Sequence, residues 1–577
     1  MDGDFGRIVE LEDRVQLSVQ ETVAVQAPLV GVTRKNIVRE LSAGITLIAI
    51  AIPLNIGYSQ IAGLPATAGL YALVVPTIVY ALIVSSRQLV ASPDAAAAAL
   101  VASSIGGLAV AGSENYAAMA LAQAIISGVL LIAMSVLKLG FLANFLSKPI
   151  LVGFVGGLAL DILVSQCAKM LGIKIDSGGE FVEKLAGLIT GLPETNLVSL
   201  MISVGVVLVL IGGRKLLPQV PWALIAMIIT TVIVALTHAD RAGVSVLGPV
   251  PSGPPPLTWP QLEWLDWLAL VPSAIALTMV TAAEGLLVSR SYGERRGYPT
   301  QPDRDLLAFG VGNCAAGLSG AFVMGSSTSR TAAMDQVGSR TQLPSIVLAV
   351  GTLLLLLFGT SLLAEIPSPT IGAIVGVAVI PLLGVRDFMS IAKKDRFELA
   401  IGAVCFLVTL LIGSIPGILV AFVLALINLA KRSASPAIDV LAANDNPSES
   451  LLESAPRGQV TAPGVIVIRM AAPIFFANSN EFSQAVKGAV TAAKQNGDHV
   501  HSVVIDMEAV TDVDVTAAES METLREWLDQ NDLRLAFSRV RDNAKPRLHR
   551  MGILRGSDAV YDTNRAAVSS VSNSDPA

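Results

Sequence analysis

"AFVMGSSTSRTAAMDQVGSR", residues 321–340, places a run of hydroxyl side chains and one arginine, Arg330, between two stretches of almost continuous apolar sequence. The short run 321–325 predicts an extended segment, and Ser327 or Thr328 can cap a helix that begins near Ser329. That helix is too short to cross a bilayer. Because a charge at membrane depth costs about 3 kcal/mol or more, Arg330 is predicted to have a function there.

The composition indicates a membrane protein. Of 577 residues, 53% are apolar and only 15% are charged, whereas soluble domains carry roughly 25% charged residues. The mean hydropathy is +0.66. Apolar runs fill residues from about 40 to 430, and they predict about twelve clear spans and two truncated ones. The fold class predicted is therefore a polytopic α-helical membrane protein with polar ends.

The distribution of Lys and Arg predicts the orientation. If the N-terminus is cytoplasmic, 19 of the 24 Lys and Arg between residues 30 and 435 lie on the cytoplasmic side, as the positive-inside rule expects. Four lie outside, and the remaining one is Arg330; the four are Lys169, Lys174, Lys184 and Arg241. We expect a multi-pass protein of the inner (plasma) membrane. Residues 1–35, which contain no signal-peptide pattern, are expected in the cytoplasm.

A second truncated span, "SSRQLVASPDAAAAALVASS" (85–104), has the same organisation as the first. A short extended run meets Ser92, predicted as an N-cap, then Pro93 as the first helical residue and a short helix of small residues. The two interruptions occupy corresponding positions in halves of about seven spans, and an odd number makes such halves inverted copies. Two facing helix N-termini together with Arg330 would form a place for an anion.

Other interpretations of these two stretches stay open at the level of sequence. Arg330 could form a structural ion pair or could extend its charge to the membrane surface, and Ser92-Pro93-Asp94 could be a plain kink. Neither alternative explains why both interruptions occur at matching positions.

The span 268–290 contains one acid, Glu284. A carboxylate buried in a membrane is costly unless it is paired or protonated, so Glu284 is a candidate proton-coupling residue. The alternative is a permanent Glu284–Arg330 pair that only holds helices together. Asp161 and Asp335 are expected to be satisfied structural groups.

The segment 49–60, "AIAIPLNIGYSQ", combines Pro53 with Asn55, Tyr58 and Gln60. Kinked polar segments in membranes can line a cavity, so Tyr58 joins the candidate anion-binding residues. The cysteines give neither a metal pattern nor a disulfide framework and are interpreted as packing residues; they are Cys167, Cys314 and Cys405. We expect no metal, no cofactor and no nucleic-acid partner.

Three motifs resemble the sulfate permease family of anion transporters: "GLPATAGLYALVVPTIVYALIVSSRQLVASPDAAAAAL" (63–100), the segment beginning "TAAEGLLVSR" (281–290), and "GSSTSRTAAMDQVGSRTQL" (325–343). The resemblance covers nearly the whole chain. It implies fourteen membrane segments in two inverted repeats of seven, with a core domain that moves against a gate domain like an elevator.

In that family the anion lies between the starts of the third and tenth segments. The matching residues are Pro93, Asp94, Ala95, Ser329, Arg330 and Thr331. The resemblance also matches Glu284 to the acid of proton-coupled members. The chain departs from many members at Ser92, where they have glycine, and at Leu54, where many sulfate transporters have glutamine. The resemblance therefore leaves the substrate open.

The polar tail predicts a second domain. After a linker, residues 436–460, strands alternate with amphipathic helices over residues 461–577, which indicates a small cytoplasmic α/β domain. "PIFFANSNEF" and "DMEAVTDVDVTAAESMETL" resemble the STAS domain of sulfate transporters and anti-sigma-factor antagonists. Antagonists of that type are phosphorylated at a position that matches Thr516, although a helix cap by Thr516 or a neighbouring acid is the plainer role. We expect the tail to serve regulation or contacts in a homodimer.

The sequence leaves several functions in competition. The first is a secondary transporter, residues 36–435, that moves sulfate inward with protons across the lipid bilayer. The alternatives are transport of bicarbonate, chloride or a C4-dicarboxylate, with sodium as a less expected coupling ion, and anion sensing coupled to signalling through the tail. An enzyme is not expected, because no catalytic constellation is present and the four histidines lie in loops or the tail; they are His238, His499, His501 and His549.

Overall fold

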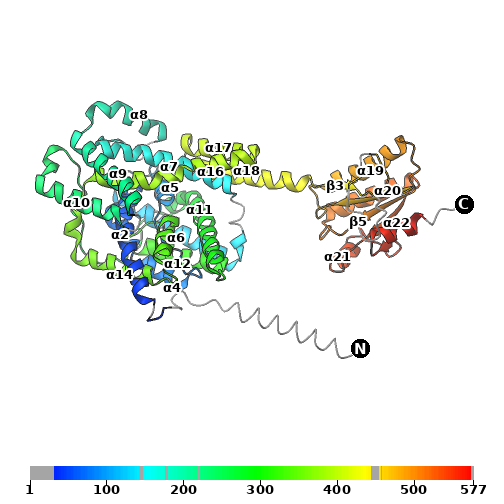
Figure 1. Cartoon of the computed structure of the whole chain (residues 1–577), viewed down its shortest axis with the longest axis horizontal. Helices are drawn as coiled ribbons and strands as arrows, with labels where there is room; N and C mark the ends of the chain where they lie inside the picture. Colours follow the sequence, from blue (N-terminus) through cyan, green and yellow to red (C-terminus); the bar gives the residue numbers. More distant parts are fainter. Residues whose placement is uncertain are drawn as a thin grey trace. The chain divides into compact units, whose positions relative to one another are not determined.

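The computed structural model describes residues 32–34, 36–141, 147–175, 180–217, 220–442, 454–455 and 458–572. The chain divides into two compact units between Ala425 and Leu426 (Figure 1). Nearly all of the expected N-terminal segment 1–35, and most of the expected linker 436–460, lies outside the described residues.

The membrane unit begins with a series of seven segments, two of them divided. They are α2 (Ile37–Ile61), α3 (Ala66–Tyr71) with α4 (Val75–Ile83), β1 (Ala91–Ser92) with α5 (Ala95–Ile105), α6 (Glu114–Val136), α7 (Lys148–Leu171), α9 (Leu197–Leu216) and α10 (Trp222–Thr237). Helix α8 (Phe181–Gly191) and the short 3-10 helices η2 (Leu192–Glu194) and η3 (Ala239–Ala242) lie in the connections.

A second series of seven follows in the same order. It comprises α11 (Trp264–Arg296), α12 (Pro302–Leu318), β2 (Gly325–Ser326) with α13 (Thr328–Val337), α14 (Leu343–Phe358), α15 (Ser368–Val379), α17 (Arg396–Leu411) and α18 (Ser414–Ala434). The connections carry η4 (Thr360–Leu363), η5 (Ile380–Leu383) and α16 (Val385–Lys394). The twelve expected clear spans and the two truncated ones thus each correspond to one segment.

Length, composition and exposure agree with a lipid environment. Among the described residues, seven helical stretches are long and apolar enough to cross a membrane, and three shorter helices, α5, α10 and α14, are also apolar. Helix α9 shows why these helices need lipid. Leu197, Met201, Val204 and Leu208 recur at helical spacing on one face and are exposed, so this face would contact hydrocarbon rather than water.

The contacts between helices support two related halves. Helix α2 packs against α13 and α14, whereas its counterpart α11 packs against α5 and α6. Each first segment therefore contacts the half-helix of the other series. The strands β1 and β2 pair antiparallel, with Ala91 opposite Ser326 and Ser92 opposite Gly325, which is the arrangement expected for counterparts related by a two-fold axis.

The helices of the membrane unit form two bundles. We call α2–α6 with α11–α14 the first bundle, and α7–α10 with α15–α17 the second bundle, because most contacts fall within these sets. The bundles meet where α2 contacts α10 and α15, and where α5 contacts α7. Both half-helices belong to the first bundle.

Glycine allows the most extensive helix pair of the first bundle, α6 with α12, to approach closely. A Cβ on Gly128 would lie 2.7 Å from the Gly310 carbonyl oxygen, and one on Gly310 would lie 2.8 Å from the Gly128 carbonyl oxygen. Small residues of this kind are the usual means of close helix packing in membranes. Cys314 packs at the same contact and is free, as are Cys167 and Cys405, which is consistent with packing roles.

The second unit is a five-stranded sheet with helices on both faces. Its order is β3 (Ile438–Val440), β4 (Val465–Met470), β5 (Ser502–Asp506), β6 (Arg534–Ser538) and β7 (Ala559–Tyr561), with β3 antiparallel to β4 and the other neighbours parallel. Helices α19 (Ser479–Gln495), α20 (Val515–Gln530) and α21 (Lys545–Arg550) share one apolar core with the sheet, while α22 (Asn564–Ser572) covers the other face.

Three strands and two helices of this unit are those expected from the sequence. The edge strands β3 and β7 are not, because each has only three residues and too little alternation to be recognised. Strand β3 also lies inside the expected linker 436–460, where Ile438 pairs with Met470. The sheet of this unit therefore includes one strand that precedes residue 461.

The α6–α12 contact gives a prediction about stability. Gly128→Ala should lower the melting temperature of the purified protein, because overpacking of a tight contact typically costs about 1–3 kcal/mol. Gly205→Ala in α9, where a Cβ meets nothing within 4 Å, is the matched control and should melt at or slightly above the wild-type temperature. Equal melting temperatures for the two variants would contradict the close packing.

Candidate functional site

The two short strands bring the starts of both half-helices together. Beyond the pairing of β1 with β2, the Ser327 amide donates to the Val90 carbonyl oxygen at 3.0 Å, and the Val90 amide donates to Thr331 Oγ1 at 3.0 Å. Thr331 Oγ1 also donates to the Ser327 carbonyl oxygen at 2.6 Å. Thr331, expected at the anion site, therefore joins the two interruptions through its hydroxyl.

The helix caps differ in part from expectation. Ser327 caps α13, as predicted, by accepting the Arg330 amide at 3.4 Å. Helix α5 begins at Ala95, and its cap is Asp94, which accepts the Ala97 amide at 2.7 Å. The prediction of Ser92 as the cap and Pro93 as the first helical residue is wrong, because pairing with β2 keeps the chain extended through Ser92.

Arg330 lies at the meeting point of the half-helices and is only 1% exposed. Its Nε donates to Ser327 Oγ at 2.7 Å and its Nη2 donates to the Pro93 carbonyl oxygen at 2.5 Å. The guanidinium carbon lies 5.9 Å from the centre of the Tyr58 ring, a cation–π distance. Nη1 is buried and has no partner among the described residues.

The two short strands also carry unpaired hydroxyls. Those of Ser92 and Ser326 are buried and have no hydrogen-bond partner among the described residues, and the register places them on opposite faces of the strand pair. Buried polar groups normally have partners, so the unpaired guanidinium nitrogen of Arg330 is a donor that a bound anion can satisfy. The sequence analysis did not select Ser326, although the run of hydroxyl residues that contains it was the available signal.

The N-termini of both half-helices supply the rest of a positive environment. At α13, Thr328 and Ser329 are exposed in the first turn, whereas at α5 Ala95 is 2% exposed. Each N-terminus carries roughly half a positive charge and free backbone amides. Together with Arg330 they can bind an anion that has several oxygen atoms.

Two carboxyl groups lie near the arginine. Asp94 is close enough to Arg330 and Tyr58 for electrostatic interaction with both. Glu284, in the middle of α11, interacts electrostatically with Asp94. It is half-buried and has no hydrogen bond or ion pair with any described residue, Arg330 included. A permanent Glu284–Arg330 pair is therefore not the arrangement seen.

Several other polar groups of the membrane unit have partners, although the Asn55 Oδ1 atom is buried without one among the described residues. Asp161 pairs with Lys184 at 2.8 Å, and Gln60 accepts from Lys169 Nζ at 3.2 Å. In the same helix as Gln60, Asn55 Nδ2 donates to the Ala51 carbonyl oxygen at 2.8 Å. Of the polar residues in 49–60, Tyr58 is thus the one that contacts the arginine.

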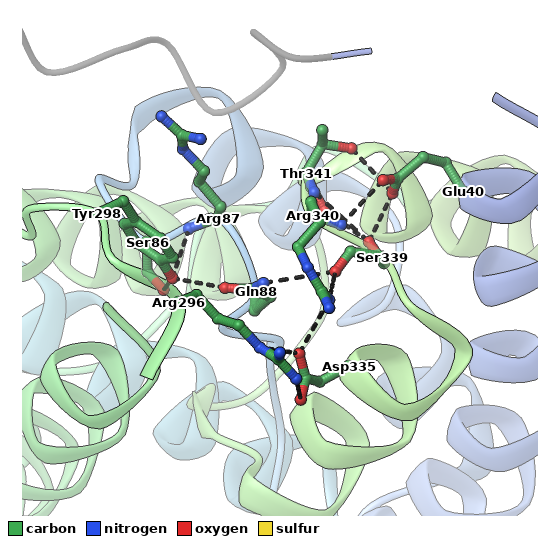
Figure 2. Close-up of polar contacts among 10 residues, drawn as sticks. All are labelled: Glu40, Ser86, Arg87, Gln88, Arg296, Tyr298, Asp335, Ser339, Arg340 and Thr341. Carbon is green, nitrogen blue, oxygen red and sulfur yellow. Dashed lines mark hydrogen bonds and ion pairs between the residues drawn. The ribbon is translucent and has the colours of Figure 1, made fainter. Parts of the chain in front are cut away.

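The far end of α13 is held by a network of charges (Figure 2). Asp335 accepts from Arg296 Nε at 2.9 Å and from Arg340 Nη1 at 3.0 Å, with the two guanidinium groups on either side. The expectation that Asp335 is a structural group is confirmed. The two arginines also suit the negative end of the helix dipole.

Buried Glu40 extends the same network from α2. Its carboxylate accepts from the Arg340 amide at 2.9 Å, from Thr341 Oγ1 at 3.0 Å and from the Ser339 hydroxyl. Gln88, next to β1, donates to the Ser339 carbonyl oxygen at 3.4 Å. Four segments of the first bundle are therefore fastened together at the C-terminal end of α13.

The α/β unit offers no comparable site. Asp514 caps α20 by accepting the Ala517 amide at 2.8 Å, so a neighbouring acid takes the cap role that had been considered for Thr516. Thr516 is exposed in the first turn of that helix. No cluster of three or more His, Cys, Asp or Glu side chains suited to a metal occurs within the described ranges.

These features define a polytopic membrane protein with a candidate anion site at the centre of its first bundle. The chain belongs to the sulfate permease family, whose model matches residues 37–405, and a STAS domain model matches residues 459–567. It is 31% identical to a probable sulfate transporter of Mycobacterium tuberculosis over 532 residues, which cover 92% of this chain and 94% of the relative. Sulfate transporter 3.1 of Arabidopsis thaliana is 26% identical over 534 residues, covering 89% and 80%.

Solved structures agree with the fold. The anion transporter Slc26a9 of mouse, in its inward-facing state, aligns with a TM-score of 0.83 at 20% identity over 94% of this chain and 92% of that one. The membrane domain of the cyanobacterial bicarbonate transporter BicA aligns with a TM-score of 0.60 at 23% identity over 68% of this chain and 98% of that one. The protein is thus a multi-pass anion transporter of this family with a C-terminal STAS domain, and not an enzyme.

The Ser327 hydroxyl gives a prediction about the site's stability. Ser327→Ala should lower the melting temperature of the purified protein, because it removes a helix cap worth about 1 kcal/mol and one acceptor of the buried guanidinium. Thr328→Ala, one residue along and exposed, is the control and should change the melting temperature little. If both variants melt like the wild type, the hydroxyl does not support Arg330 as described.

Proposed function

We propose that this chain is a secondary active transporter that carries sulfate inward together with protons. The observation that carries the proposal is the buried guanidinium of Arg330, whose Nη1 has no partner among the described residues, at the starts of two half-helices. The names of the relatives in Mycobacterium and Arabidopsis support sulfate as the anion.

In this proposal the anion is held by Arg330, by the amides at the two helix starts and by nearby hydroxyls. The neighbourhoods are Pro93-Asp94-Ala95 and Ser329-Arg330-Thr331, with the Tyr58 ring against the guanidinium. A sulfate ion has four oxygen atoms that accept hydrogen bonds, which suits several converging donors. At the start of α13, the hydroxyls of Thr328 and Ser329 are exposed and available to the anion.

Glu284 is proposed as a proton carrier. Glu284 is half-buried and has no partner among the described residues that would offset a negative charge. Protonation would remove the free-energy cost of burying that charge. A bound dianion nearby would favour the protonated form, and protonation would in turn favour the anion, because coupling between two sites is reciprocal.

For the transport step we propose an elevator-like movement of one bundle against the other. The β1–β2 pair and the Glu40–Arg340 and Asp335–Arg296 contacts all lie within the first bundle, which supports its movement as one body with the anion. Such movement of one repeat-based bundle past another is a usual form of alternating access.

The placement of the chain is also proposed. The excess of Lys and Arg on one side supports a protein of the inner (plasma) membrane with the N-terminal segment 1–35 and the STAS domain in the cytoplasm. We propose a homodimer in which the STAS domain serves contacts or regulation. The exposed position of Thr516 leaves it accessible to a kinase.

Uptake of radiolabelled sulfate into proteoliposomes tests the function. Sulfate uptake should rise with an inward proton gradient. In Glu284→Gln the gradient-driven accumulation of sulfate should be about tenfold lower than in the wild type, because coupling between two sites usually changes affinity by such a factor. Glu294→Gln, an exposed acid on the same helix that pairs with Arg290, is the control and should behave like the wild type.

Two outcomes of that experiment would overturn the proposal in different ways. Uptake that ignores the proton gradient in both the wild type and Glu284→Gln would reject proton coupling, and dependence on a sodium gradient would replace it. Stronger suppression of uptake by bicarbonate, chloride or a C4-dicarboxylate than by unlabelled sulfate would reject sulfate as the cargo.

A further inference from the structure

A second carboxyl group, Asp94, lies inside the candidate anion site, where it would repel the proposed cargo. We propose that Asp94 is the resident counter-ion of Arg330 and a second proton carrier, so that two protons accompany each divalent anion. This inference rests on the proposed function, because it assigns the number of protons to the same transport cycle.

The position of the Asp94 carboxylate is fixed by its surroundings. One oxygen accepts the Ala97 amide at 2.7 Å, and the other lies against Gly325 of β2, where a Cβ would be 2.3 Å from it. The carboxylate oxygen therefore occupies the space that a side chain at position 325 would fill. It stays at the start of α5, near Arg330, in every stage at which the β1–β2 pair is intact.

The cap role by itself does not account for an acid at this position. The counterpart half-helix α13 is capped by the neutral hydroxyl of Ser327, and serine and asparagine are caps of about the same quality as aspartate. What aspartate adds is a negative charge. That charge acts on Arg330 and on Glu284.

The net charge of the site is close to zero in two states: with the anion bound and both carboxyls protonated, and without the anion and with both carboxyls ionised. Arg330 contributes one positive charge and the two helix starts contribute about half a charge each, so about two positive charges face a divalent anion. An ionised Asp94 and an ionised Glu284 would add two uncompensated negative charges when the anion binds. With both carboxyls protonated the sum returns to about zero, and without the anion the ionised carboxylates themselves provide the balance.

The other charged groups near Asp94 do not alter this count. Helix α2 contributes Tyr58, α11 contributes Glu284 and α13 contributes Arg330. Helices α6 and α7 also pack near α5, but among the described residues no charged group on them acts on Asp94. In each cycle a proton from one aqueous side would bind a carboxylate oxygen of Asp94 and leave to the other side, with no other bond changed.

The test compares variants that keep the cap and remove the charge. Asp94→Asn and Asp94→Ser should melt below the wild type, because they remove the counter-ion of Arg330, and Asp94→Ala should melt lower still, because the cap is lost as well. With sulfate and proton uptake measured together in proteoliposomes, we expect about two protons per sulfate for the wild type and about one for Asp94→Asn, since one of two linked sites is gone.

Binding of sulfate to the purified protein gives an independent measurement. At pH values where both carboxyls are ionised in the free protein, the apparent Kd for sulfate should rise about a hundredfold per pH unit in the wild type. In Asp94→Asn or Glu284→Gln it should rise about tenfold per pH unit, because each proton that binds with the anion contributes a factor of ten. The double variant should bind with little dependence on pH.

The possible failures can be told apart. A wild-type ratio of one proton per sulfate, or an unchanged ratio and pH slope in both Asp94→Asn and Asp94→Ser, would overturn the role of Asp94 and leave the proposed function standing. Sulfate uptake without any proton movement in the wild type would instead overturn the proposed function itself. If Asp94→Asn does not fold, the same measurements on Asp94→Ser decide the question.

Discussion

The antiparallel contact between β1 and β2 is the interaction on which the site of this transporter depends. Each strand has only two residues, yet the pair satisfies backbone groups that would otherwise be unpaired deep in a membrane. By stopping two helices at mid-membrane, it leaves two N-termini with free amides in one place. Arg330 is then fastened across the contact, through Ser327 on its own segment and the Pro93 carbonyl oxygen on the other.

The surrounding bundle holds this arrangement rigidly. The half-helix α13 has ten residues, too few to be stable alone in any environment that competes for its hydrogen bonds. Its far end is secured by Asp335 between two arginines and, through Arg340, by the buried carboxylate of Glu40. A charge network at one end thus maintains the geometry of a binding site at the other.

The electrostatics of the site follow from the same contact. Positive charge from Arg330 and two helix starts is partly opposed by Asp94 and Glu284, so the site is neither strongly cationic nor free of competing anions. Such a balance permits an anion to bind and also to leave. In the proposed transport cycle, the number of protons carried with the anion would depend on which carboxyls are ionised.

The sequence by itself determined the membrane class, the two series of seven segments, both interruptions and the presence of Arg330 at the second of them. These follow from hydropathy, from capping residues and from the cost of a charge in lipid, which are all local properties. It also predicted the central strands of the STAS domain. The edge strands β3 and β7 were not predicted, because three residues are too few to show the alternation of apolar and polar side chains that marks a strand.

Only the tertiary structure decided which groups meet. Pairing with β2 moved the cap of α5 from Ser92 to Asp94, and a hydrogen bond with Val90 made Thr331 a link between the half-helices. It also left Glu284 without the arginine as its partner. The first two of these depend on residues more than 230 positions apart, and no local pattern records which distant segment will lie alongside.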